Sequence, residues 1–252
     1  MQALPPAPLP ARRRLTIVRT LAHGYLLDWR RTRAPLLWLI FLAVSAWADR
    51  ALGSGIGPGS ATVTFPTAAV LGLLAGHTFA SRWRAAGTVR LVLLQAARPI
   101  DVACGWWAGA CVALAGAGAV FSVYIALRAG PTAALGAAGF ALLGALGIAA
   151  FAQAIALALP RDAAAVLGIL LVVWGLGPPE RFIPVGSPAW LGSVIAAVGW
   201  LLPTAHGAAE AFVGVARWLR VASAASHIAL GLLLAAWILA RPAARARTGA
   251  QE

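Results

Sequence analysis

Long uncharged apolar runs, separated by clusters of arginine, constrain the fold of this chain more than any other feature. All twenty basic residues are arginine, and most of them fall in three clusters at 12–33, 82–98 and 241–247. Hydrophobic residues make up 61% of the sequence and charged residues 11%, about half the charged fraction of a soluble domain. This layout predicts a polytopic membrane protein whose arginine-rich segments face the cytoplasm. It argues against nucleic-acid binding as the reason for the net charge of +13, because no soluble domain separates the apolar runs.

The apolar runs predict an all-α domain over residues 34–240 with six transmembrane helices. The predicted spans are 35–51, 62–80, 101–127, 133–159, 163–177 and 220–240. Another apolar stretch, 188–215, contains Pro203 and is expected to form a re-entrant pair of short helices between spans five and six. Six spans keep both termini and fifteen of the twenty arginines on the cytoplasmic side. A seventh span would move the last arginine cluster outside and weaken this bias.

The segments that flank the six spans are predicted to lie outside the membrane. Residues 1–11 are rich in proline and alanine and predict a disordered tail, with no sign of a cleaved signal peptide. In 12–33, apolar side chains recur three or four positions apart from Leu15 to Trp29, which predicts an amphipathic connecting helix on the inner membrane surface. The residues expected to anchor it there are Arg12, Arg13, Arg14, Arg19, Trp29, Arg30 and Arg31. Residues 241–252 are predicted to form a cytoplasmic tail.

The predicted spans contain few groups that could perform chemistry. Carboxylates and arginines at membrane depth are the usual marks of proton relays, and the spans hold essentially none. Asp101 and Asp162 stand at span ends, where we expect carboxylates at helix N-termini. Ser226 and His227 are adjacent, so their side chains would diverge on a helix and could not act as a nucleophile and its base. No catalytic residue is therefore predicted.

No cofactor is expected in this chain. Cys104 and Cys111 are the only cysteines, and they have no further ligands nearby to make a metal site. The phosphate-binding pattern G-x-x-x-x-G-K-[ST] requires a lysine, which the chain does not contain. If ATP and Mg²⁺ drive this protein, another chain binds them. The alternatives are an ion-coupled carrier or channel that uses His77 or Gln153, and an intramembrane enzyme or assembly factor.

The segment 82–98, which joins the second and third predicted spans, is the most specific feature of the sequence. Its apolar positions from Trp83 to Val92 recur at helical spacing, and Pro99 marks its end. We therefore predict an amphipathic cytoplasmic helix, with Gly87 as a weak point. About a dozen helical residues would form a stiff rod of about 18 Å, suited to pass a push from a cytoplasmic partner into the spans.

This segment resembles the coupling helix of ABC-2 type transporter permeases, in which R-x-x-G-T…LL…P follows the second span. The matching residues here are Arg82, Gly87, Thr88, Leu91, Leu93, Leu94, Arg98 and Pro99. The connecting helix, the six spans and the re-entrant pair also resemble that family. One departure is that Arg84, Ala85 and Ala86 stand where the family often has acidic residues, so we expect a more acidic groove on the partner.

The resemblance implies a non-enzymatic permease subunit of an ATP-driven exporter. It implies a homodimer or heterodimer of permeases with two ABC ATPase chains bound below, and these hold the ATP and Mg²⁺. The residues expected to couple to the ATPase are Arg82, Trp83, Arg84, Gly87, Thr88, Arg90, Leu91, Leu94 and Arg98.

The resemblance also sets expectations for the cargo and the location. Apolar spans rich in small residues and tryptophan suit a lipophilic or amphiphilic cargo such as a drug, antibiotic or lipid, and small permeases of this kind are commonly associated with antibiotic efflux and resistance. The path is expected between two permeases, along spans 2 and 5, with His77, Gln153 and Trp174 as candidate lining residues. We expect a multi-pass protein of the cytoplasmic membrane.

Overall fold

The computed structural model describes residues 11–51, 61–94, 98–175, 183, 186–201 and 217–241. All regular structure within these residues is helical, as the sequence predicts. Each predicted span coincides with one helix: α2 (Ala34–Ala51), α3 (Ala61–Ala85), α5 (Pro99–Ala129), α6 (Pro131–Ala158), α7 (Arg161–Gly175) and α10 (Arg217–Ala240). The remaining helices are α1 (Ala11–Arg31), α4 (Thr88–Leu94) and α8 (Ala189–Leu201).

Three helices in the described part of the chain are long and apolar enough to cross a membrane. The stretches are Pro99–Leu127 in α5, Ala141–Ala158 in α6 and Val221–Ala240 in α10, and α2 adds a shorter apolar stretch, Ala34–Trp47. Large apolar side chains point outward over much of the bundle, among them Leu127, which is 83% exposed. Such a surface is unusual on a soluble monomer and indicates a helical membrane protein.

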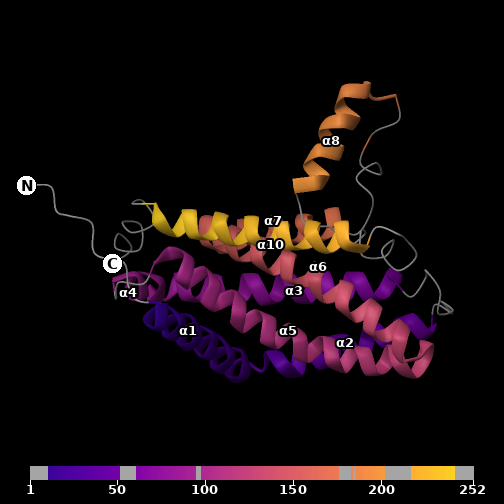
Figure 1. Cartoon of the computed structure of the whole chain (residues 1–252), viewed down its shortest axis with the longest axis horizontal. Helices are drawn as coiled ribbons and strands as arrows, with labels where there is room; N and C mark the ends of the chain where they lie inside the picture. Colours follow the sequence, from indigo (N-terminus) through magenta and orange to yellow (C-terminus); the bar gives the residue numbers. More distant parts are fainter. Residues whose placement is uncertain are drawn as a thin grey trace, which may run out of the picture.

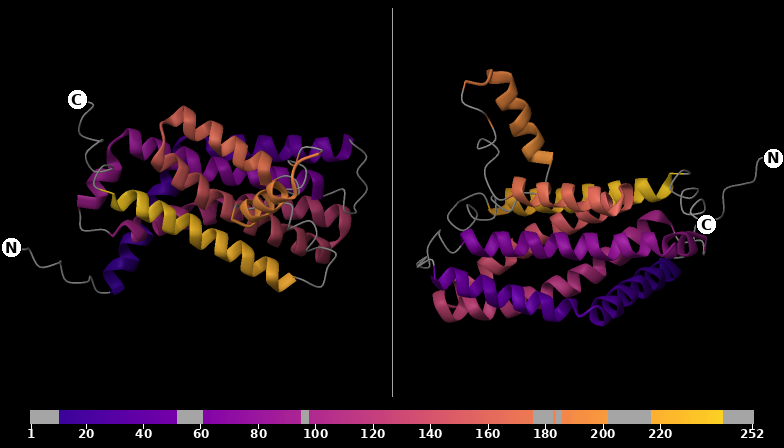
Figure 2. Two further views of the ribbon diagram at one scale, coloured as in Figure 1. Left: turned by 90° about the horizontal axis from the view of Figure 1, so that it is seen from above. Right: turned by 180° about the vertical axis from the view of Figure 1, so that it is seen from behind.

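The helices that coincide with predicted spans run side by side along the long axis of the molecule (Figure 1). Successive helices point in alternating directions, so α3, α6 and α10 end where α5 and α7 begin (Figures 1 and 2). The short helix α4 lies at this same end. We call this end of the bundle the α4 end, and we define it by Thr88–Leu94, the start of α5 and the end of α6.

Helix α6 lies at the centre of the bundle, between α3, α5 and α10. Of Ala141–Ala158, 67% is buried, compared with 22% of the α10 stretch Val221–Ala240. Glycines allow the helix backbones to approach this closely, as is typical of helices in lipid. A Cβ atom on Gly76 of α3 would lie 2.1 Å from the carbonyl oxygen of Ala149, and one on Gly231 of α10 would lie 2.8 Å from the Ala150 Cβ.

Breaks between the helices follow glycine and proline. The predicted separation of spans 101–127 and 133–159 is confirmed at Gly130–Pro131: Gly130 has a φ of +88° and Pro131 begins α6. Glycine adopts this left-handed conformation without a Cβ clash, and proline is preset for the first turn of a helix. Between α1 and α2, Arg33 has a φ of +59°, a conformation that costs an L-residue about 1–2 kcal/mol.

Helix α8 stands away from the bundle, crosswise to its long axis (Figures 1 and 2). The first helix of the pair predicted over 188–215 is present as Ala189–Leu201. The second, predicted after Pro203, lies outside the described residues, and the re-entrant path stays a prediction. The tail residues 1–10 and 242–252 also lie outside the described part, while Ala11, predicted to belong to the tail, begins α1.

Candidate functional site

The candidate site is the α4 end, where the segment 82–98 meets the bundle. Helix α3 continues past its predicted limit to Ala85, and α4 begins at Thr88. Between them Gly87 has a φ of +66°, and its N–H donates to the carbonyl oxygen of Arg84 at 3.1 Å. A left-handed glycine of this kind closes a helix. The structure therefore divides the predicted single helix in two, although the apolar spacing continues across Gly87.

Helix α4 has a packed inner face and an open outer face. Val89 is buried, and Val92 and Leu93 pack against the main core. Leu91 points outward with 61% of its surface exposed. Gly87 and Thr88 are half-buried, whereas the side chains of Arg90 and Leu94 lie outside the described part of the structure. Among the described side chains of α4, Leu91 is thus the exposed apolar one.

Three predicted coupling residues in the last turn of α3 point in three different directions. Arg82 forms an ion pair with Asp28 of α1, with 3.0 Å between Nη1 and Oδ2. Trp83 packs inward among aromatic rings. Arg84 turns toward the C-terminal end of α6, where its Nη1 donates to backbone carbonyl oxygens. The resemblance predicted that all three contact the ATPase. In the structure, Trp83 and Arg84 are directed into the bundle.

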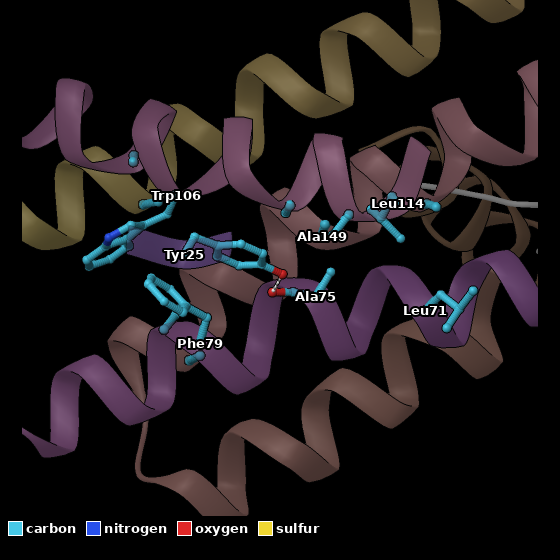
Figure 3. Packing of buried hydrophobic residues seen from close by; sticks show 14 of the residues in the cluster. Tyr25, Leu71, Ala75, Phe79, Trp106, Leu114 and Ala149 are labelled. Atoms are coloured by element: carbon cyan, nitrogen blue, oxygen red, sulfur yellow. Dashed lines mark hydrogen bonds between the residues drawn. The ribbon is translucent and has the colours of Figure 1, made fainter. Parts of the chain in front are cut away.

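An aromatic cluster backs this end of the bundle. The Phe79 ring centroid lies 4.6 Å from those of Tyr25 and Trp83, and 5.9 Å from that of Trp106. The Tyr25 hydroxyl donates to the Ala75 carbonyl oxygen at 3.0 Å (Figure 3). Burial raises the pKa of Tyr25, which keeps the donor proton in place. Contacts between these aromatic rings therefore join helices α1, α3 and α5 next to the segment 82–98.

Asp101 joins the start of α5 to α1. It lies in the first turn of α5, and Asp162 lies in that of α7, so both predicted helix N-terminal carboxylates are confirmed. The Asp101 side chain is 5% exposed and its Oδ1 lies 2.7 Å from Nη2 of Arg14. This hydrogen bond, together with the charge of Asp101, raises the pKa of Arg14. Arg14, expected at the membrane surface, instead fixes α1 to the bundle.

We expect Asp101→Asn to lower the melting temperature by more than Asp28→Asn does, because it removes the buried carboxylate that holds Arg14 of α1 against the start of α5. Thermal unfolding of the detergent-solubilised chain would measure this loss. Asp28→Asn is the matched control, since the Arg82–Asp28 pair is more exposed and such pairs contribute about 0–1 kcal/mol. Equal effects of the two substitutions would contradict the structural role of Asp101.

The middle of α1 packs against the bundle, whereas Leu15 near its start is exposed. Tyr25 is 3% exposed, and Leu21 is also buried. A Cβ atom on Gly105 or Gly109 of α5 would meet these two side chains at 2.7 and 2.6 Å, so the glycines admit α1 to the bundle. Trp29, a predicted anchor, packs edge-on against Trp38. The predicted anchors that do reach the surface are Arg12, Arg13, Arg19, Arg30 and Arg31.

The three candidate path residues belong to different surroundings. The half-buried His77 of α3 lies 3.3 Å from the Ser81 hydroxyl and interacts with the backbone of Arg161 at the start of α7. Gln153 of α6 is buried and donates to the Ala103 carbonyl oxygen of α5 at 3.3 Å. Trp174 lies in α7, and its side chain is outside the described part. His77 and Gln153 thus face different neighbouring helices.

Sequence reasoning missed the partners that hold the site together. Asp28 is one of only seven acidic residues in the chain and lies within the first arginine cluster, 12–33, which indicates that it could pair with an arginine. Phe79 and Trp106 gave a weaker signal, since both fell in apolar runs. Their roles emerge only from contacts between helices.

The groups gathered at the α4 end are arginines, aromatic rings and helix ends. No group of three His, Cys, Asp or Glu side chains within the described residues is arranged to hold a metal ion. Ser226 is exposed and donates to the Ser223 carbonyl oxygen, while His227 is buried, so the two side chains diverge as predicted. No protein family model and no curated protein matches this chain. The geometry of the α4 end therefore guides the functional assignment.

Proposed function

We propose that this chain is the permease subunit of an ATP-driven exporter of the ABC-2 type. In this proposal the six helices α2, α3, α5, α6, α7 and α10 cross the cytoplasmic membrane, and both termini are cytoplasmic. The alternating helix directions support an even number of crossings. The α4 end then faces the cytoplasm, as its arginines require.

The observation that carries the proposal is how α4 is attached to the bundle. Its inner face is packed against the bundle by Val89, and it follows α3 and precedes α5. Its outer face presents Leu91. A force applied there by a moving partner would reach two long helices at once. Such a coupling element needs a separate engine, and a cytoplasmic ABC ATPase of that kind would bind the ATP and Mg²⁺.

The cargo path is proposed to run between two permeases rather than through one. A cavity of about 40 Å³ lies between α2, α3, α5 and α6, lined by apolar residues that include Leu42, Leu71 and Phe121. Pockets that hold drug-sized ligands are about 300–1,000 Å³, so this one is far too small. Helix α7 exposes Val166, Ile169 and Leu170, which suits a path for a lipophilic or amphiphilic cargo such as a drug, antibiotic or lipid.

Contacts of the intramembrane polar groups favour the exporter over an ion-coupled carrier. Gln153 is hydrogen-bonded to the Ala103 carbonyl, and His77 pairs with Ser81 within α3. These are interactions that hold helices in place. They leave energy coupling to the exposed surface of the α4 end.

Copurification of this chain from its native membrane tests whether an ABC ATPase is bound to it. We expect a stable complex in detergent that hydrolyses ATP, and reconstituted vesicles that move a lipophilic dye only when ATP is present. Dye transport by the chain alone, driven by a proton gradient and lost in Gln153→Leu, would establish the carrier instead.

A further inference from the structure

We propose that Arg84 is a positioning residue that joins the coupling segment to the α6–α7 turn. A push on α4 would then move α6 and α7 together with α3, instead of reaching only the two helices that flank α4. The inference deepens the proposed transport function and rests on it for the direction of the push. The physical connection itself is independent of that function.

The guanidinium of Arg84 makes this connection across the bundle. Its Nη1 donates to the carbonyl oxygen of Ala156 at 3.3 Å and also to that of Leu159. The arginine stands in the last turn of α3, directly before the turn at Gly87 that leads to α4. The two acceptors belong to the last turn and the C-cap of α6. One side chain thus bridges the base of α4 and the end of the central helix.

These carbonyl groups need an outside donor because of the residue that follows them. In an α-helix the Ala156 carbonyl would accept the N–H of residue 160, but that residue is Pro160, which has none. Leu159 is the C-cap that follows α6, so its carbonyl also lacks an intrahelical partner. Both oxygens lie at the negative end of the helix dipole, where a cation is favoured. Arg84 supplies the missing donor and the positive charge together.

Helix α3 also packs closely against α7, the helix that follows this turn. A Cβ atom on Gly168 of α7 would lie 2.4 Å from Leu73 Cδ1 of α3. Helix α3 therefore contacts both helices that the α6–α7 turn joins, with Arg84 in its last turn, nearest to α4.

Arg82 provides a matched comparison two residues earlier. Its side chain is 50% exposed and pairs with Asp28 on the opposite side, toward α1. The resemblance predicted that both arginines contact the ATPase. The structure separates them: Arg82 remains accessible to a cytoplasmic partner, whereas Arg84 is engaged inside the bundle.

Hydrogen exchange on the full chain in lipid nanodiscs tests the connection without any ATPase. In Arg84→Gln we expect backbone amides in 157–164 to exchange about tenfold faster than in the wild type. Arg82→Gln should leave them unchanged, and Arg84→Lys should give an intermediate rate because one ammonium replaces a planar fork. Exchange in Arg84→Gln within about twofold of the wild type would overturn the inference.

A second measurement, on the complex with the copurified ATPase, tests transmission. In a chain that carries Cys104→Ala and Cys111→Ala, so that the native thiols are not labelled, spin labels on Val166→Cys of α7 and Leu233→Cys of α10, both exposed, would report the change in their distance when ATP and vanadate are added. We expect Arg84→Gln to retain the ATPase but to lose at least about half of that change. Loss of the ATPase itself would make Arg84 a docking residue and overturn the inference. If the wild type binds no ATPase, the proposed function fails, and the exchange experiment still decides the connection.

Discussion

Gly76→Ala is expected to lower the melting temperature of this protein by about 6–12 °C, which corresponds to about 3 kcal/mol for a chain of this size. The reason is the contact between α3 and α6. A Cβ atom at position 76 would lie 2.1 Å from the carbonyl oxygen of Ala149, and a backbone atom cannot swing aside as a side chain can. The two helices would have to separate along their length. Thermal unfolding in detergent would measure the loss.

Gly116→Ala is the control for this experiment. Gly116 lies in α5, and a Cβ atom there would have no neighbour within 4 Å. The same change should therefore leave stability unchanged or raise it by up to about 1 kcal/mol, because alanine favours the helix more than glycine. Similar melting temperatures for the two variants would show that α3 and α6 are not packed this closely.

The helical framework was predictable because it depends on local properties. Six apolar runs coincide with six helices, and breakers such as Gly130–Pro131 end them where expected. A run of apolar residues that spans lipid must satisfy its backbone hydrogen bonds within the segment. A helix does this. The bounds shift by a few residues at most positions, as with α3, which continues to Ala85.

The candidate site was predicted only in part, because its contacts join distant segments. Periodicity located the segment 82–98 but not the end of a helix at Gly87, since apolar spacing carries no information about φ. The acceptor of Arg84 lies 72 positions away, and that of Tyr25 lies 50 positions away. An arginine on a cytoplasmic segment is equally compatible with a partner, a headgroup or a helix end. Only the packing of α3 on α6 decides among them.

The largest functional effect is expected from Leu91→Glu. We predict that this change weakens binding of the ABC ATPase by about thirtyfold, or about 2 kcal/mol. Leu91 is the exposed apolar group of α4, and a carboxylate there would both remove apolar contact and repel the acidic groove that the arginines of this segment call for. Titration of the purified ATPase against the permease in nanodiscs would measure the change.

Leu127→Glu is the matched control, because Leu127 is still more exposed but lies at the far end of α5, away from the α4 end. Leu91→Glu should not alter the melting temperature by more than about 2 °C, since an exposed position outside the predicted spans contributes little to stability. Leu91→Arg separates the two causes of the loss: it removes the same apolar contact but has the charge that an acidic groove favours. Weaker binding in all three variants would place the docking surface elsewhere, whereas a loss confined to Leu91→Glu would establish both its position and the sign of the partner's charge.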